Sequence, residues 1–307
     1  MSGLKIIRKR IASVKNTQKI TKAMKMVAAA RLRRAQQAIL ELRPYALETQ
    51  AVLSSVAARA GTDDAHPLLA RRPEHKVLLV VLTSDRGLAG AFNASINKTA
   101  YQLLRKMQAD GKEVFVAVVG RKGRDYFTRR GITPRNEVRN VFENLTLGKA
   151  NEIAETLIKA YAPLFDPEHG TSGEATGPET VQPDFDAVYL IYNEFKSAID
   201  QKVVVEPLLP VKADPAVEAQ DDVDFIYEPS KRALLDRLIS MYVRTQIFRA
   251  LLESVASEHG ARMTAMDNAT RNASDMIERL TLKFNRARQA AITKELMEII
   301  GGAEALK

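Results

Sequence analysis

The chain has 307 residues, of which 46% are hydrophobic, and it carries a formal net charge of +9. This composition supports one sizeable core, and the absence of cysteine excludes disulfides, thiol switches and cysteine-ligated metal sites. The apolar runs are far shorter than the roughly 20 residues that cross a membrane, and we expect no secretory signal after Met1. The four histidines are scattered along the chain, so no metal is expected.

The positive charge is concentrated at the N-terminus. Residues 1–40 hold 11 of the 46 Lys and Arg residues and none of the 37 Asp and Glu residues. Three functions fit such a segment: an arm that binds nucleic acid, a helix on a membrane surface, or a shaft that turns against acidic protein surfaces. A cleavable organellar presequence is disfavoured, because the helical pattern continues past residue 40 without a cleavage zone of small residues.

A long helix is predicted within residues 1–60. Its apolar residues alternate in steps of three and four, as in the seam of a coiled coil. The seam consists first of Leu4, Ile7, Ile11 and Val14 and then, after a shift, of Ile20, Met24, Val27, Leu32, Ile39 and Leu42. Pro44 is expected to bend the helix, and a cluster of turn-forming residues at Gly61–Pro67 follows it.

The middle of the chain, residues 76–210, alternates between strand and helix patterns. The predicted strands are Val77–Leu82, Val114–Val119, Val138–Phe142, Asp186–Tyr192 and Val203–Pro207, and the predicted helices are Asn93–Met107, Arg121–Arg130 and Glu152–Tyr161. This alternation predicts a Rossmann-like α/β domain with a largely parallel sheet. The segment Asp166–Pro183 is rich in Gly, Pro, Thr and Glu and is predicted to be a mobile insertion.

The last predicted element is a helix from about Pro229 to Ile300, within residues 229–307. Roughly 70 helical residues would make a rod of about 100 Å, which favours a shaft, lever or spacer over a pocket enzyme. Its seam residues are Leu234, Leu238, Met241, Phe248, Leu252, Val255, Met266, Ala269, Ala273, Met276 and Leu280. Each long helix is too polar on its outer face to be a core helix. We therefore expect the two to form an antiparallel coiled coil beside the α/β domain.

Two glycine-containing turns follow predicted strands. Ser84–Gly90 is neither a Walker A sequence nor a dinucleotide fingerprint, so it is either a simple turn or a loop that contacts a partner. Gly120–Arg124 could cradle a phosphate, although a solvated turn is the simpler interpretation. The chain has no nucleophile-elbow pattern or other catalytic constellation, so we expect neither catalytic residues nor a cofactor.

Two features of the last helix suggest partners. Glu258 and Arg262 are spaced as an ordinary intrahelical ion pair, and a partner contact is the alternative. Near its end the helix carries an apolar stripe: Ile292, Leu296, Ile299 and Ile300. An isolated helix tip has nothing against which to bury such a stripe, so the stripe suggests a socket in another protein.

Four segments of the chain resemble the gamma subunit of the F-type ATP synthase. They are Ile11–Ala30 (IASVKNTQKITKAMKMVAAA), Ser84–Asn93 (SDRGLAGAFN), Ser257–Thr270 (SEHGARMTAMDNAT) and Arg288–Leu306 (RQAAITKELMEIIGGAEAL). The resemblance spans the whole chain and is weakest at about residues 130–220. Ala89 stands where the family usually has cysteine. The insertion also lacks the cysteine pair of the redox-regulated plastid form, so thiol control is not expected.

This resemblance implies a non-catalytic central stalk that couples proton flow through a ring of c subunits to conformational cycling of the catalytic beta subunits. The implied partners are alpha, beta, epsilon and the c ring, without nucleic acid, at the cytoplasmic face of the cell membrane. The implied beta contacts are Met24, Lys25, Asp85, Arg86, Ala89, Glu258, Arg262, Arg288, Gln289, Thr293 and Glu295. Tyr227 and Glu228 would contact the c ring and epsilon.

The residues alone leave two other functions open. A basic coiled coil that binds nucleic acid fits the net charge, although the basic segment has no aromatic residue before Tyr45 that could stack on bases. A small-molecule enzyme built on the α/β domain would bind a saturable ligand that stabilises residues 76–210.

Overall fold

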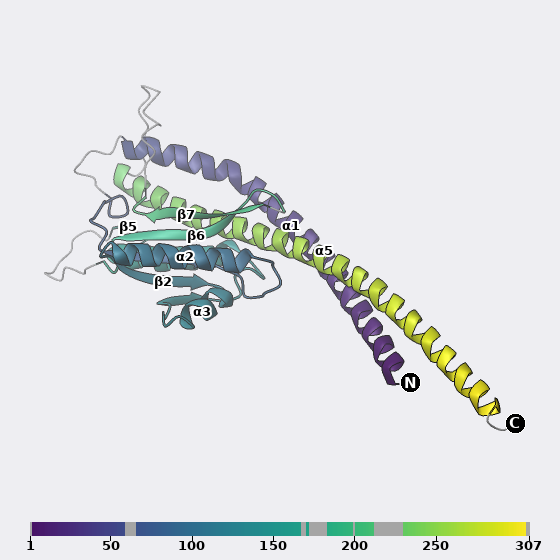
Figure 1. Ribbon diagram of the computed structural model, residues 1–307. Coiled ribbons are helices and arrows are strands. Elements are labelled where there is room, and N and C mark those ends of the chain that lie inside the picture. The colour runs from purple at the N-terminus through teal and green to yellow at the C-terminus, as the bar shows by residue number, and fades with distance from the viewer. Residues whose placement is uncertain are drawn as a thin grey trace. The chain divides into compact units, whose positions relative to one another are not determined.

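The computed structural model describes residues 2–58, 66–166, 170–171, 183–198, 200–211 and 230–304. The chain forms two compact units. The first contains Met1–Ala30 and Arg262–Lys307, and the second contains Arg31–Ala261. Two long helices, α1 (Ser2–Ala58) and α5 (Lys231–Glu304), each contribute one segment to both units (Figure 1). Both predicted long helices are therefore confirmed, and Pro44 lies inside α1.

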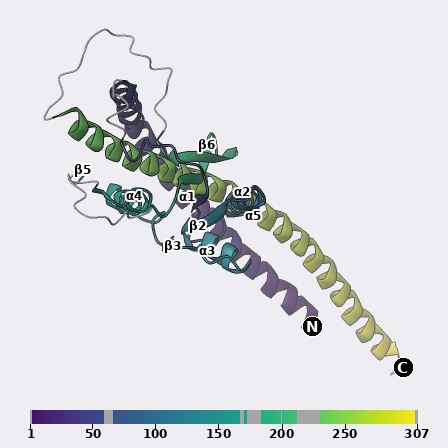
Figure 2. The ribbon, with the colours of Figure 1, turned by 90° about the vertical axis from the view of Figure 1, so that its left-hand side faces the viewer.

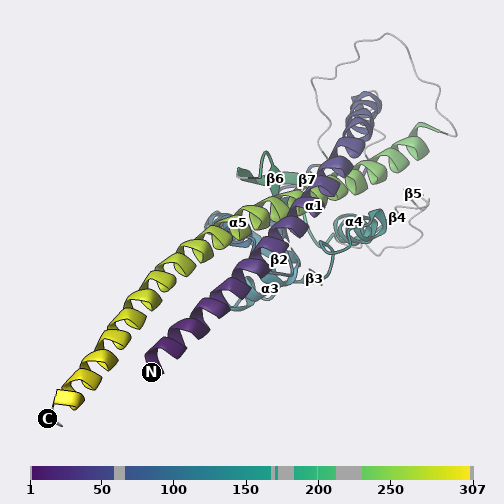
Figure 3. The same cartoon turned by 90° about the vertical axis from the view of Figure 1, so that its right-hand side faces the viewer.

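The first unit is an antiparallel helix pair, as the sequence predicts. Lys25 Nζ lies 2.5 Å from Asp267 Oδ1, and Gln18 Nε2 donates to Ser274 Oγ at 2.7 Å. From the first contact to the second, the chain moves back seven residues on α1 and forward seven on α5. This heptad step in opposite directions is the signature of an antiparallel coiled coil. Figure 3 shows the N- and C-terminal ends of the pair at the same end of this unit.

The α1 seam does not shift as predicted. Ile20 and Val27 are 60% and 55% exposed, whereas Thr21 is only 8% exposed. The Thr21 hydroxyl oxygen lies 2.8 Å from that of Thr270. The seam keeps the heptad spacing of its first residues by accepting Thr21 and Lys25, and Ile20 and Val27 face outward instead.

On the α5 side of the seam, one predicted position is wrong. Met266 and Ala273 are buried as expected, but Met276 is 45% exposed and the adjacent Ile277 is half-buried in its place. Ala28 of α1 is 2% exposed. Small side chains such as Ala28 and Ala273 let two helix backbones approach closely.

The second unit is built on a five-stranded sheet. Its order is β3-β2-β1-β6-β7, in which the first four strands are parallel and β7 is antiparallel to β6. The strands are β1 (Lys76–Leu82), β2 (Glu113–Val119), β3 (Asn136–Val138), β6 (Ala187–Phe195) and β7 (Gln201–Leu209), with a separate small pair of β4 (Phe165–Asp166) and β5 (Gly170–Thr171). The predicted Rossmann-like α/β domain is confirmed.

Helices cover both faces of this sheet. They are α2 (Phe92–Ala109), α3 (Arg121–Thr128) and α4 (Leu147–Tyr161). Right-handed crossovers place α2 and α3 on one face, whereas α4, which returns the chain across β2 and β1 to β6, lies on the other (Figure 2). Arg244 of α5 donates to Glu155 of α4 at 3.2 Å, so residues 231–261 of α5 pack on the α4 side.

Two predicted elements in this unit differ most from the observed ones. The third strand is not Val138–Phe142, because β3 ends at Val138 and Asn140 adopts a left-handed φ of 58° that ends the extended chain. Val141 and Phe142 are buried within the turn that follows. Helix α4 starts five residues before the predicted Glu152, because the Thr146 side chain caps it by accepting from the Lys149 N–H.

The part of α5 in the second unit is a core helix, contrary to the prediction from its polar residues. Thr245, Ser257 and His259 are each at most 5% exposed. Ser257 donates to the Asn193 carbonyl oxygen at 3.1 Å. A buried hydroxyl such as that of Ser257 is tolerated because it is hydrogen-bonded to a neighbouring strand.

Candidate partner-binding site

The loop after β1 is held from inside by a buried carboxylate. Asp85 is 8% exposed, and its two oxygens accept from the backbone N–H groups of Arg121, at 3.1 Å, and Asn140, at 2.9 Å. Asp85 therefore ties the β1 loop to the chain segments that follow β2 and β3. These loops lie at the carboxyl ends of neighbouring parallel strands, where α/β folds place their ligand-contacting residues.

The same contacts exclude a phosphate cradle at Gly120–Arg124. The first amide groups of α3 already have acceptors: Asp85 for Arg121, the Ser84 carbonyl for Lys122 at 3.1 Å, and the Thr83 hydroxyl for Gly123 at 2.8 Å. A helix N-terminus binds an anion through free backbone N–H groups. At this helix the Asp85 carboxylate occupies the position that a bound anion would take.

The exposed tip of the β1 loop consists of Arg86 and Leu88. The Arg86 side chain is 72% exposed and pairs with Glu143 at 2.6 Å. Leu88 is 65% exposed and adopts a positive φ of 62°, whereas Ala89 is buried. Sequence reasoning missed Leu88, although an apolar residue between two glycines of a surface loop was the available signal. An exposed leucine held in a strained conformation is suited to contact a partner.

In the first unit, the implied contact residues Met24 and Lys25 lie at the edge of the seam and are half-buried. The Lys25 ammonium donates a hydrogen bond to the Asp267 carboxylate, and this bond lowers the pKa of the Asp267 carboxyl below its usual value. Next to them, Ile20, Met26 and Val27 are 55–60% exposed. The outward face of α1 is therefore more apolar than its basic composition suggests.

The end of α5 combines exposed polar residues with exposed apolar ones. Arg288, Gln289, Thr293 and Glu295 are all exposed, and the Thr293 hydroxyl donates to the Gln289 carbonyl at 3.0 Å. The apolar stripe there is also exposed: Ile292 at 49%, Leu296 at 54%, Met297 at 64%, Ile299 at 68% and Ile300 at 55%. Large apolar side chains this close together mark a surface that another protein covers.

The remaining implied site residues do not join these groups. Glu258 is 4% exposed within the second unit, and its carboxylate lies 3.7 Å from His259 Nδ1. Arg262 belongs to the first unit and is half-buried. Tyr227 and Glu228 lie outside the described residues, as does most of the predicted insertion Asp166–Pro183.

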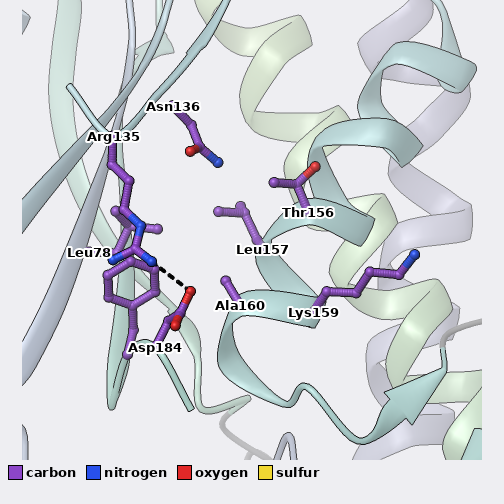
Figure 4. A pocket seen from close by; sticks show the side chains of 9 residues that line it. Leu78, Arg135, Asn136, Thr156, Leu157, Lys159, Ala160 and Asp184 are labelled. Carbon is purple, nitrogen blue, oxygen red and sulfur yellow. Dashed lines mark hydrogen bonds and ion pairs between the residues drawn. The ribbon is translucent and has the colours of Figure 1, made fainter. Parts of the chain in front are cut away.

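A cavity of about 350 Å³ opens between α4 and the amino ends of β1 and β3. Arg135 donates to Asp184 at 2.8 Å at one wall, and Figure 4 shows Leu157 turned toward the space and the Lys159 amine turned away from it. The Thr156 hydroxyl at its rim donates to the Glu152 carbonyl. The lining combines this ion pair with apolar side chains and a few uncharged polar groups, and this set does not indicate a particular reaction.

No described helix combines the length and apolarity needed to cross a membrane. The ATP synthase family model matches residues 3–306 of the chain. Two similar curated proteins are the ATP synthase gamma chains of Anaeromyxobacter sp. (strain Fw109-5), 52% identical over 309 residues, and Sorangium cellulosum (strain So ce56), 50% identical over 341 residues. In both comparisons all of this chain and all of the relative are covered.

Solved structures of ATP synthases also resemble this chain. A chain in the structure of the central stalk and c ring of the Tetrahymena thermophila mitochondrial ATP synthase matches with a TM-score of 0.57 and 26% identity, covering 81% of this chain and 99% of that chain. A chain of the Euglena gracilis mitochondrial ATP synthase matches with a TM-score of 0.65 at 20% identity, covering 99% and 95%, which supports the fold alone. This chain belongs to the ATP synthase gamma chain family.

Proposed function

We propose that this chain is the rotating shaft of a proton-translocating ATP synthase and has no catalytic site of its own. It would couple rotation of a c ring to conformational cycling of the catalytic beta subunits. In this role the shaft contacts open and closed beta conformations differently and so shifts their populations as it turns.

The observation that carries the proposal is the exposed apolar stripe from Ile292 to Ile300. Burying it in a sleeve formed by alpha and beta subunits would stabilise the complex by about 25 cal/mol per Å² of apolar surface removed from water. Apolar contacts are non-directional, so a tip covered by them can turn within its sleeve with little angular preference. The neighbouring exposed residues Arg288, Gln289, Thr293 and Glu295 would meet a loop of beta at the same level.

The other contacts follow from which side chains are exposed. On the helix pair, the beta subunit would meet Met24 and the outward residues Ile20 and Val27, while Lys25 would act through its pair with Asp267. On the loop after β1, Arg86 and Leu88 would make the contact, with Asp85 and Ala89 positioning them from beneath. Glu258, being buried, would act by holding α5 in place, and Arg262 would contact beta.

The partners at the other end would be epsilon and the c ring, which Tyr227 and Glu228 would contact. The chain would reach the membrane only through these subunits, at the cytoplasmic face of the cell membrane. The basic first 40 residues would steer the shaft toward acidic surfaces of beta, because exposed charges affect orientation and association rate more than affinity.

Reconstitution tests the proposal. The full chain is mixed with purified alpha and beta subunits, and co-elution and ATPase activity are measured at low and high salt. We expect a stable complex whose ATPase depends on this chain. Replacing Ile299 and Ile300 by Ser is expected to weaken the complex. Lys294→Ser, at an exposed polar position of the same end of α5, is the matched control and is expected to leave the complex intact. Absence of a complex, with salt-sensitive nucleic-acid binding instead, would favour the nucleic-acid alternative.

A further inference from the structure

A face of the second unit that the proposed function does not use carries two tyrosines and two arginines. Tyr101 of α2 and Tyr126 of α3 pack edge to face, with ring centroids 6.4 Å apart and planes at 78°. The guanidinium carbon of Arg130 lies 3.6 Å from the Tyr126 centroid, and that of Arg105 lies 5.3 Å from the Tyr101 centroid. These four residues are the tyrosine–arginine cluster.

Each arginine of the cluster is held in place by the chain itself. Arg130 donates to the Tyr126 carbonyl at 3.2 Å and also lies 5.5 Å from the Tyr101 centroid. Arg105 Nε donates to the Tyr101 hydroxyl at 3.0 Å. Stacking and one hydrogen bond therefore fix each guanidinium and leave it further N–H donors. Side chains ordered in advance lose less conformational entropy when a partner binds.

Neither arginine of the cluster has an acidic partner in the part of the chain that the structure describes. Within the described ranges, no acidic side chain forms an ion pair with Arg105 or Arg130, whereas Arg124 and Arg135 each have carboxylate partners at 2.8 Å. Further exposed cations on α3 or the turn after it are Arg121, Lys122 and Arg129. The surface around the cluster thus presents several further cations.

We propose that the tyrosine–arginine cluster binds an acidic surface of another protein. The planar guanidinium fork matches the two oxygens of a carboxylate, and two forks beside tyrosine rings provide both ion pairing and apolar contact area. Tyrosine and arginine are also enriched among the few residues that dominate the binding energy of protein interfaces. The inference goes beyond the shaft role, because the cluster lies on the α/β domain and not on the helix pair.

The same geometry disfavours binding of single-stranded nucleic acid or of an anionic membrane surface. Single-stranded nucleic acid needs open aromatic faces on which bases stack, but Arg130 already covers a face of Tyr126. A membrane-surface helix needs exposed apolar residues that insert below the headgroups. Among the described residues, the large apolar side chains with high exposure lie outside α2 and α3.

Photo-cross-linking in the purified ATP synthase complex tests the inference. p-Benzoylphenylalanine replaces Tyr101 in the full chain, and cross-linked peptides are identified by mass spectrometry. We expect an adduct with a peptide of another subunit that has Asp or Glu residues beside the attachment point. Replacing Arg105 and Arg130 by Gln is expected to lower its yield roughly tenfold, the effect of losing about one charge-assisted hydrogen bond. The control probe replaces Lys106, which lies about 140° around α2 from Tyr101.

A second pair of variants requires no probe. Arg105→Glu with Arg130→Glu is expected to lower ATP-driven proton pumping or release a subunit, while Lys106→Glu with Lys159→Glu, which changes the charge equally, has no such effect. The proposal is overturned by equal behaviour of the two pairs. It is also overturned by an adduct with lipid, nucleic acid or a peptide without acidic residues, or by no adduct above the Lys106 control. ATPase that still depends on the chain in these samples would leave the shaft role intact.

Discussion

Lys25 and Asp267 form an ion pair across the helix pair, with 2.5 Å between Nζ and Oδ1. Asp267 also accepts from Arg271 one turn later on α5, so one carboxylate joins the two helices and a neighbouring turn. This contact and the hydroxyl pair of Thr21 and Thr270 occupy consecutive levels of the seam. Polar residues at seam positions specify register at some cost in stability.

Exchanging the charges of Lys25 and Asp267 tests whether the pair fixes the register. Lys25→Asp places two carboxylates together and Asp267→Lys places two ammonium groups together, so each single variant is expected to lower ATP-driven proton pumping per ATP hydrolysed. The double variant restores an ion pair and is expected to recover pumping. Lys22→Asp, at an exposed position three residues before Lys25, is the control. A double variant that is no better than the worse single variant would contradict the register role.

Removing the Asp85 carboxylate should destabilise the second unit. Asp85→Ala leaves two backbone N–H groups without their acceptor, at a cost of about 1–3 kcal/mol for each that stays buried. Asp85→Asn keeps one acceptor oxygen and is expected to lose less. Urea unfolding of the full chain measures both variants, with the exposed Asp110→Ala as control. An Asp85→Ala variant as stable as Asp110→Ala would show that the contacts seen at this loop carry no stability.

Gly120 is expected to tolerate no side chain. Its φ is 92°, and a Cβ would lie 2.1 Å from the Thr83 carbonyl oxygen, which belongs to a buried strand end and cannot move aside. We expect Gly120→Ala to cost about 4 kcal/mol or more. Gly111 has a φ of 81° but open space around its Cβ position, so Gly111→Ala should cost about 1 kcal/mol from backbone strain alone. Similar urea midpoints for the two variants would refute the close approach.

The fold could be predicted from the sequence wherever the hydrophobic pattern is periodic. The candidate site could not be predicted where it depends on individual side-chain contacts. The buried strands at Val77–Leu82 and Val114–Val119 and both long helices are confirmed, because continuous apolar runs and heptads are strong signals. The shift to Ile20 and Val27 is wrong because nothing in the sequence marks Thr21 and Lys25 as partners of Thr270 and Asp267. Likewise, Asp85 is a charged residue in a surface-type loop, and only the structure shows it turned inward toward Arg121 and Asn140.

Stability should depend on pH through His66. Its ring is fully buried, Nδ1 accepts from the Leu68 N–H, and Nε2 lies 3.0 Å from Asp236 Oδ1. Burial lowers the pKa of His66 to about 4, with Asp236 opposing and Arg232 adding to that shift. As pH falls from about 6.5 to 4, the unfolded chain binds a proton that the folded chain does not, so the free energy of unfolding falls by on the order of 3 kcal/mol.

Thermal melting of wild type and His66→Ala between neutral pH and pH about 4 measures this effect. His66→Ala is expected to be less stable at neutral pH, and the gap should close as pH falls because the variant lacks the titrating ring. His75→Ala, at an exposed histidine, is the control substitution. A gap that stays constant across this range would contradict the assignment.

Rotation of the chain inside its complex tests the shaft role most directly. The sequence has no cysteine, so a single cysteine at the exposed residue Lys106 takes a visible probe at one defined point. With alpha and beta subunits fixed to a surface, the account predicts that ATP drives continuous rotation of the probe in one direction. A complex that hydrolyses ATP while the probe stays fixed would contradict the shaft role.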